Sequence, residues 1–153
     1  MRRCLMMLTS ALVISTACGG SSGSGSTGPT NTGGRTMSAK VDGAAWSTLA
    51  VGGSVSNGAV ILAGSDGTQT IGISFAAAAG TQTISAGTIV SGSLTIGSLT
   101  WKAGPGSGTG SVTVTAATAN HFAGTFSFTA QGLVASTTPA TRQVTAGTFD
   151  VTF

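Results

Sequence analysis

Apolar and polar residues alternate with a period of two through most of the chain beyond Thr36. Successive side chains of a β-strand point to opposite faces, so this pattern predicts strands with one buried face. The predicted buried faces carry Met37, Ala39 and Val41; Ile71, Ile73 and Phe75; Val112 and Val114; Phe122, Phe126 and Phe128; and Phe149, Val151 and Phe153. Turn residues such as Asp42-Gly43, Asn57-Gly58 and Asp66-Gly67 separate the segments. Residues 36–153 are therefore predicted to form one all-β domain, an antiparallel sandwich or barrel-like fold of about eight or nine short strands.

The alternation changes phase within Ser93–Ala103. Leu94 and Ile96 lie on one face of a regular strand, whereas Leu99 and Trp101 lie on the other. A β-bulge at Gly97-Ser98 would add one residue and return both pairs to a common face. We therefore expect a bulged strand across this segment.

The tripeptide Ala-Gly-Thr recurs at Ala79, Ala86, Ala123 and Ala146. Its irregular spacing excludes a solenoid or propeller, which needs a fixed period. The last two copies open the similar segments Ala-Gly-Thr-Phe-Ser-Phe and Ala-Gly-Thr-Phe-Asp-Val. Glycine before an aromatic-rich strand permits a bend or a close approach, and we expect these two strands to be neighbours.

The N-terminal segment follows a different pattern. Met1-Arg2-Arg3 is positively charged, and the apolar stretch Cys4–Ala17 is shorter than the roughly 20 residues that a membrane-spanning helix needs. A positive start, a short apolar stretch and small residues before a cleavage site are typical of a secretory signal. Residues 1–17 are predicted to be this signal, with cleavage after Ala17.

The residues around that cleavage site, Ser15-Thr16-Ala17-Cys18, resemble the lipobox of bacterial lipoproteins, although Ser15 stands where that family usually has leucine. The resemblance implies that Cys18 becomes the first mature residue and carries a diacylglycerol, usually with acylation of its amine. Gly19 after it favours the outer membrane, on the periplasmic or surface face. The alternative is an ordinary thiol, whose only disulfide partner, Cys4, would leave with the signal. Residues 18–35 are rich in glycine, serine and threonine and are predicted to be a flexible tether.

Charge is scarce, at 6% of all residues. Without Arg2 and Arg3, 6 − 2 = 4 basic residues face 3 acidic ones, and the basic residues are scattered. Nucleic-acid binding depends on clustered cations, so we expect no nucleic-acid partner. Few charges also leave sheet edges weakly protected, so self-association is an expected option, with Lys40, Lys102 and Arg142 as candidate edge guards.

Catalytic chemistry has few candidates beyond the signal, where the chain has one histidine, three aspartates and no glutamate. A hydrolase centred on His121 with Asp150 is one arrangement, but no Gly-x-Ser-x-Gly elbow accompanies it, and an exposed turn histidine is the simpler interpretation. Hydrolysis of a sugar by paired carboxylates would need two neighbours among Asp42, Asp66 and Asp150, but Asp42 and Asp66 precede glycine and are typical turn residues. One histidine and no free cysteine exclude a zinc site. We therefore expect no enzyme activity, no metal and no cofactor.

Trp46 and Trp101 are the candidate ligand-binding residues. Exposed tryptophans stack on sugars in carbohydrate-binding modules. The alternative is burial in the core, because a domain this poor in large side chains needs the apolar area of both indoles.

Three segments resemble a family of small uncharacterised bacterial lipoproteins: Ala39–Trp46, Gly124–Thr129 and Gly147–Phe153. The resemblance covers most of Met37–Phe153 and implies the β-rich fold without an activity. We predict a non-enzymatic, lipid-anchored cell-envelope protein with a structural, adhesive or ligand-binding domain, whose glycan or protein ligand is open. A carbohydrate-binding module using Trp46 and Trp101 is the first alternative, and a hydrolase at His121 is the second.

Overall fold

The computed structural model describes residues 34–85 and 87–153. The predicted signal, the predicted cleavage site at Ala17 and the predicted lipidation site at Cys18 lie outside the described residues, as does nearly all of the predicted tether. Eleven strands form in the described part: β1 (Arg35–Val41), β2 (Ala44–Ser47), β3 (Ala50–Ser56), β4 (Ala59–Ser65), β5 (Gln69–Ala76), β6 (Gly80–Ile84), β7 (Ser91–Ile96), β8 (Leu99–Ala103), β9 (Thr109–Ala117), β10 (His121–Gly132) and β11 (Thr141–Thr152). Within these ranges no helix is long and apolar enough to cross a membrane.

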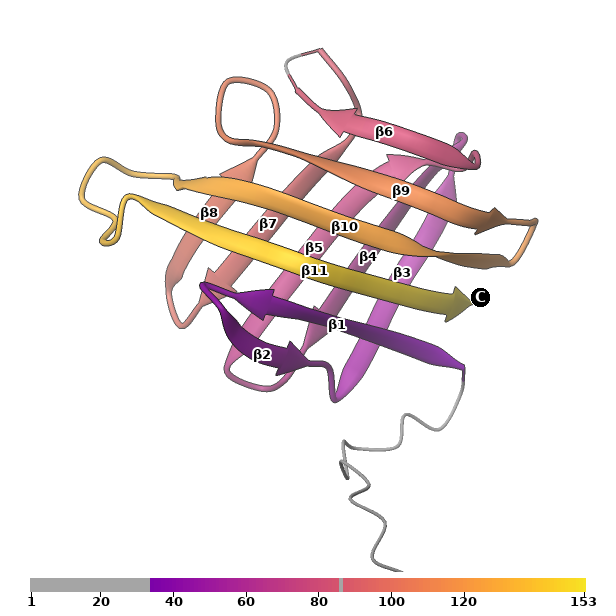
Figure 1. Cartoon of the computed structure of the whole chain (residues 1–153), viewed down its shortest axis with the longest axis horizontal. Coiled ribbons are helices and arrows are strands. Elements are labelled where there is room, and N and C mark those ends of the chain that lie inside the picture. Colours follow the sequence, from indigo (N-terminus) through magenta and orange to yellow (C-terminus); the bar gives the residue numbers. More distant parts are fainter. Residues whose placement is uncertain (1–33, 86) are drawn as a thin grey trace, which may run out of the picture.

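The strands form two layers that cross each other (Figure 1). The front layer has the order β2-β1-β11-β10-β9-β6, and the back layer has the order β8-β7-β5-β4-β3. One strand joins them, because Phe122–Thr129 of β10 pair with β9 while Gln131 and Gly132 pair with β8. A single antiparallel sheet therefore curls over at the end of β10, which confirms the predicted all-β, sandwich or barrel-like class.

Eleven strands in the described part exceed the expected eight or nine because some strands lack a two-residue hydrophobic period. β2 has only four residues, and the sequence of β3 is Ala-Val-Gly-Gly-Ser-Val-Ser, with one buried side chain. β6 likewise has a single buried residue, Ile84. Backbone pairing with a neighbour, rather than burial of one face, holds these segments extended.

The bulge expected at Gly97-Ser98 is wrong. These two residues are the turn of a hairpin, in which Leu94 lies opposite Trp101 and Ile96 opposite Leu99. Gly97 has a φ of 58°, and glycine at the first central position is typical of the type II′ turn. The change of phase therefore marks a reversal of the chain rather than an extra residue in one strand.

The core fills the space between the layers and is centred on phenylalanine. Phe75 of the back layer packs against Phe122 and Phe149 of the front layer, with ring centroids 6.3 and 5.1 Å apart. Phe126 lies 6.5 Å from Phe149 in the same cluster. The predicted buried faces agree with these positions, and aromatic rings supply much of the apolar area in a chain otherwise rich in small residues.

The two Ala-Gly-Thr-Phe segments are neighbours, as expected. In the β10–β11 pair, Gly124 lies opposite Phe149 and Gly147 lies opposite Phe126. A Cβ at Gly124 would meet the Phe149 ring at 2.8 Å, and a Cβ at Gly147 would meet the Phe126 ring at 2.6 Å. Each glycine therefore makes room for the other strand's phenylalanine, which confirms the predicted close approach.

The candidate edge guards do not lie on the outermost strands. Lys40 is on β1, between β2 and β11, and Arg142 is on β11, between β1 and β10. Lys102 is on β8 and pairs with Ser93 and with Gln131. That expectation was wrong because a scattered charge in the sequence does not reveal which strands end a sheet.

Candidate functional site

A row of five hydroxyl side chains crosses the front layer. Ser38 pairs with Thr148, Thr148 with Thr125, Thr125 with Thr113, and Thr113 with Thr81. These residues belong in turn to β1, β11, β10, β9 and β6, and we call them the hydroxyl row. Adjacent strands lie about 4.8 Å apart, so the row is a regularly spaced line of hydroxyl groups.

Hydrogen bonds tie the two ends of the hydroxyl row and leave its centre open. Ser38 Oγ lies 2.8 Å from Thr148 Oγ1, and Thr81 Oγ1 lies 3.0 Å from Thr113 Oγ1. Thr125 is exposed between them, and its hydroxyl has no hydrogen-bond partner among residues 34–85 and 87–153. The free hydrogen-bonding capacity of the row is therefore greatest at Thr125.

The repeated tripeptide places three of these threonines. Thr81, Thr125 and Thr148 each end an Ala-Gly-Thr copy, and the sheet register brings all three onto the same row. The sequence showed the repeat, but not its alignment, because the spacing along the chain is irregular. The threonines of the repeat come together on one surface only because strands that are distant in sequence pair with each other.

A shallow depression of about 360 Å³ lies at the centre of the row. Five hydroxyl residues line it, namely Ser111, Thr113, Thr125, Ser127 and Thr148, together with Phe126, Ala146 and Gly147. A bulge in β11 shapes it, because Phe126 pairs with Gly147 while Phe128 pairs with Val144, and Ala146 there has a φ of 48°. The wall is hydroxyl-rich and carries no charged side chain.

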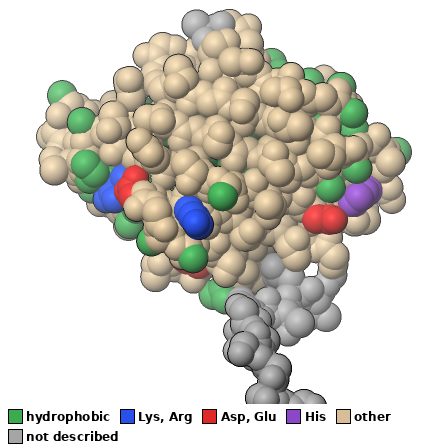
Figure 2. Space-filling view, viewed as in Figure 1, with side chains coloured by type: hydrophobic (Ala, Val, Ile, Leu, Met, Phe, Trp, Pro, Cys, Tyr) green, Lys and Arg blue, Asp and Glu red, His purple; other side chains and the backbone are tan. Residues whose placement is uncertain are grey.

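The surrounding face is also nearly uncharged. Figure 2 shows that most of the front face is coloured as neither hydrophobic nor charged. β6 and β9 contain no charged residue, and the one titratable side chain of β10 is His121 at its start. Lys40 and Asp150 lie two residues from Ser38 and Thr148, so charge approaches only one end of the row.

His121 and Asp150 are brought together by the β10–β11 pair. His121 Nε2 lies 3.0 Å from Asp150 Oδ1, and the two side chains are 36% and 61% exposed. The His121 backbone is held by Thr118, whose Oγ1 accepts from the His121 N–H. No serine or threonine hydroxyl in the described ranges is hydrogen-bonded to the imidazole.

The other two aspartates act in turns, as their sequence context predicts. The Asp66 carboxylate accepts from the N–H groups of Thr68 and Gln69, at 2.7 and 2.6 Å. Partial burial alone would raise the pKa of Asp66, but these hydrogen bonds hold it below its ordinary value. No group of three or more His, Cys, Asp or Glu side chains within the described part is arranged to hold a metal ion.

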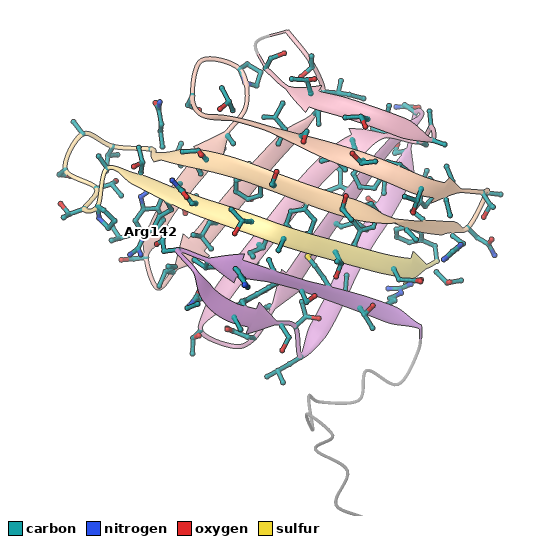
Figure 3. The ribbon with its side chains drawn as sticks, in the orientation of Figure 1. Arg142 is labelled. Carbon is teal, nitrogen blue, oxygen red and sulfur yellow. The ribbon has the colours of Figure 1, made fainter. Side chains whose placement is uncertain are left out.

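Asp42 belongs to a cluster that closes one end of the sandwich. Figure 3 shows Arg142 near the start of β11, beside the connection from β10. Arg142 donates to Asp42, and the Gln143 N–H donates to the same carboxylate. Partial burial would raise the pKa of Asp42, but these two hydrogen bonds and the guanidinium charge hold it below its ordinary value. The Arg142 guanidinium also lies 5.0 Å from the centroid of the Trp101 ring.

Both tryptophans lie in the core rather than on a platform. Trp46 is 6% exposed and Trp101 is 1% exposed. Trp101 Nε1 donates to the Pro139 carbonyl at 2.7 Å, and Arg142 covers its ring. Neither indole presents a face on which a sugar could stack. The alternative in which these two rings bind a carbohydrate is therefore wrong, because both rings are buried in the core.

Fold and site together define an all-β domain with a nearly uncharged, hydroxyl-rich face. A family model described as Domain of unknown function (DUF6252) matches residues 34–151, and the chain belongs to that family. Searches of curated proteins and of solved structures found no match.

Proposed function

We propose that this chain is a non-enzymatic, lipid-anchored cell-envelope protein whose domain binds a neutral, hydroxyl-rich ligand, such as an uncharged glycan, on its front face. The observation that carries the proposal is the charge-free depression at the centre of the hydroxyl row. Its volume of about 360 Å³ accommodates a small group rather than a protein segment.

The chemistry of the depression favours a neutral partner. A hydroxyl group both donates and accepts hydrogen bonds, so a line of them matches a ligand that also carries many hydroxyls. The exposed Ala146 adds a small apolar surface beside the polar groups. An acidic ligand would lose its hydration without gaining a cation, which costs free energy.

The anchoring half of the proposal rests on Cys18 and its lipobox-like context. Several acyl chains give a stable anchor, because each buried methylene contributes about 0.8 kcal/mol. The predicted tether, residues 18–35, would link this anchor to the domain.

Retention on immobilised polysaccharide tests the binding half. The full chain in detergent is passed over neutral dextran and over acidic alginate, and we expect retention on dextran alone. Thr125→Val keeps the side-chain shape and removes the open hydroxyl, so affinity should fall about fivefold for a lost hydrogen bond of about 1 kcal/mol. Thr70→Val, on the outer side of β5 in the back layer, is the matched control and should bind normally.

Two results would overturn the binding proposal. One is a chain that no neutral polysaccharide retains, and the other is equal retention of Thr125→Val and Thr70→Val. Palmitate labelling tests the anchor separately. Label should enter the parent chain and be absent from Cys18→Ser, and label that persists in Cys18→Ser would contradict the anchor.

A further inference from the structure

Among the strands of residues 34–85 and 87–153, three are outermost in the sheet: β2, β3 and β6. An outermost strand exposes backbone N–H and C=O groups on one side, where another strand can pair. Proteins block such edges with short strands, charges or covering loops. The three edges of this domain differ in whether any of these devices is present.

Two of the three edges are limited. β2 has four residues, which is too short for extensive pairing. At β6, Thr88 Oγ1 donates to the backbone carbonyl of Thr83. Gln82 of β6 also ties the strand to the end of β5, since its side chain bonds both the N–H and the C=O of Ala76.

The edge at β3 is long and open. β3 has seven residues, of which only Val51 is buried, and it pairs only with β4 along its length. Residues 43–65, which include β2, β3 and β4, contain no Asp, Glu, Lys, Arg or His. The charges expected to guard edges lie on other strands. β3 therefore has none of the usual devices against pairing.

Val55 of β3 has apolar surface that a further strand would cover. Val51 and Val55 lie on the same face of β3, yet Val51 is 8% exposed and Val55 is 41% exposed. Val55 lies opposite Val60 on β4, and no strand of the described part of the chain lies on its other side. An incoming strand with an apolar residue opposite Val55 would remove this surface from water.

We propose that β3 pairs with β3 of a second copy of this chain. Antiparallel pairing centred on Gly53 is the register that uses all seven residues. It places Val51 opposite Val55 of the second copy and Gly52 opposite Ser54 of the second copy. The partner thus supplies the apolar residue that Val55 lacks, and two identical uncharged edges meet without repulsion.

This pairing joins the back layers of two copies into one continuous antiparallel sheet. The front layer takes no part in it, so both copies of the hydroxyl row remain accessible. The dimer is therefore independent of whether the front face binds a glycan, and the two proposals fail separately.

Sedimentation equilibrium of the full chain in density-matched detergent measures the state of association. We expect twice the chain mass for the parent. Gly52→Lys with Ser54→Lys places two introduced lysines opposite each other at the pairing, so this variant should have the mass of a single chain. Both positions accept the change, since a Cβ at Gly52 meets nothing within 4 Å and Ser54 is exposed.

A charge swap separates pairing in this register from a general effect of charge. Gly52→Lys with Ser54→Glu places opposite charges across the two-fold axis and should retain the dimer. Thr109→Lys with Thr145→Lys adds the same charge to exposed positions of the front layer and should also retain it. A parent chain that is monomeric, which would leave the edge to an extended segment of another protein, overturns the proposal. So does a dimer that survives Gly52→Lys with Ser54→Lys.

Discussion

β10 and β3 are both strands of one sheet, yet they differ in almost every physical respect. β10 has twelve residues, pairs with three neighbours, and alternates buried and exposed positions along most of its length. β3 has seven residues, one neighbouring strand along its length and one buried side chain. Pairing on both sides and burial of one face therefore stabilise β10. The unpaired backbone groups of β3 leave that strand able to make new contacts.

Truncation of large side chains should show this difference most strongly. Phe149→Ala removes a ring packed against Phe75 and Phe126, and the free energy of unfolding should fall by about 3–5 kcal/mol. In the Gly52→Lys with Ser54→Lys background, where β3 is unpaired, Val55→Ala should lower it by less than about 1 kcal/mol, because that side chain is 41% exposed. Urea unfolding followed by circular dichroism measures both, and equal losses would contradict the comparison.

Two glycine-to-alanine substitutions test the difference between the tightly packed strands and the β3 edge. At Gly147 a Cβ would lie 2.6 Å from the Phe126 ring and from its carbonyl oxygen, so Gly147→Ala should destabilise the fold by about 1–3 kcal/mol. At Gly52 on β3 a Cβ meets nothing within 4 Å. Gly52→Ala should stabilise it by about 0.5 kcal/mol through loss of unfolded-state entropy. Thermal unfolding midpoints should shift in opposite directions, and a Gly147→Ala midpoint no lower than that of the parent would contradict a tight approach of β10 and β11.

At the bulge in β11 the reverse substitution, alanine to glycine, should stabilise the fold. Ala146 has a φ of 48°, a left-handed conformation that costs an L-residue about 1 kcal/mol relative to glycine. Ala146→Gly should therefore raise the free energy of unfolding by about 0.5–1 kcal/mol, despite the greater entropy that glycine gives the unfolded chain. Urea unfolding measures the change, and a destabilised variant would mean that the Ala146 methyl group contributes to the fold.

The smallest expected effect is the pH dependence of the Asp42–Arg142 contact. Because the pKa of Asp42 is lowered in the folded state, its contribution is present above the ordinary aspartate pKa. It is lost as the pH falls through the lowered folded value, below about pH 4. The pair is partly exposed, so the loss should be about 0.5 kcal/mol. Asp42→Asn should flatten this part of the stability–pH curve, and an unchanged acid slope would contradict it.

The sequence predicted the strands whose residues bury one face. The alternation near Phe126 and Phe149 identified β10 and β11, and their shared tripeptide indicated that they are neighbours. The turns at Asp42-Gly43 and Asn57-Gly58 were also readable, because both positions of each turn have positive φ, which Asn, Asp and Gly tolerate. Local chemistry determines such features.

Features that depend on strands far apart in sequence were not predictable. The hydroxyl row needs the register of β1, β11, β10, β9 and β6, which no local pattern contains. The Gly97-Ser98 turn was mistaken for a bulge because both shift the hydrophobic phase by one residue. The sequence did not show whether Trp46 and Trp101 lie in the core or form an exposed platform. Tryptophan is suited to either role, and only the packing of the two layers determines where each ring lies.

Nuclear magnetic resonance titration tests whether a neutral ligand binds at the hydroxyl row. Isotope-labelled full chain in detergent is titrated with a neutral dextran oligosaccharide, and amide shifts are followed residue by residue. We expect shifts centred on Thr125, Ser127 and Thr148, with β3 and β4 unaffected. Shifts confined to the back layer, or no shifts at all, would contradict it.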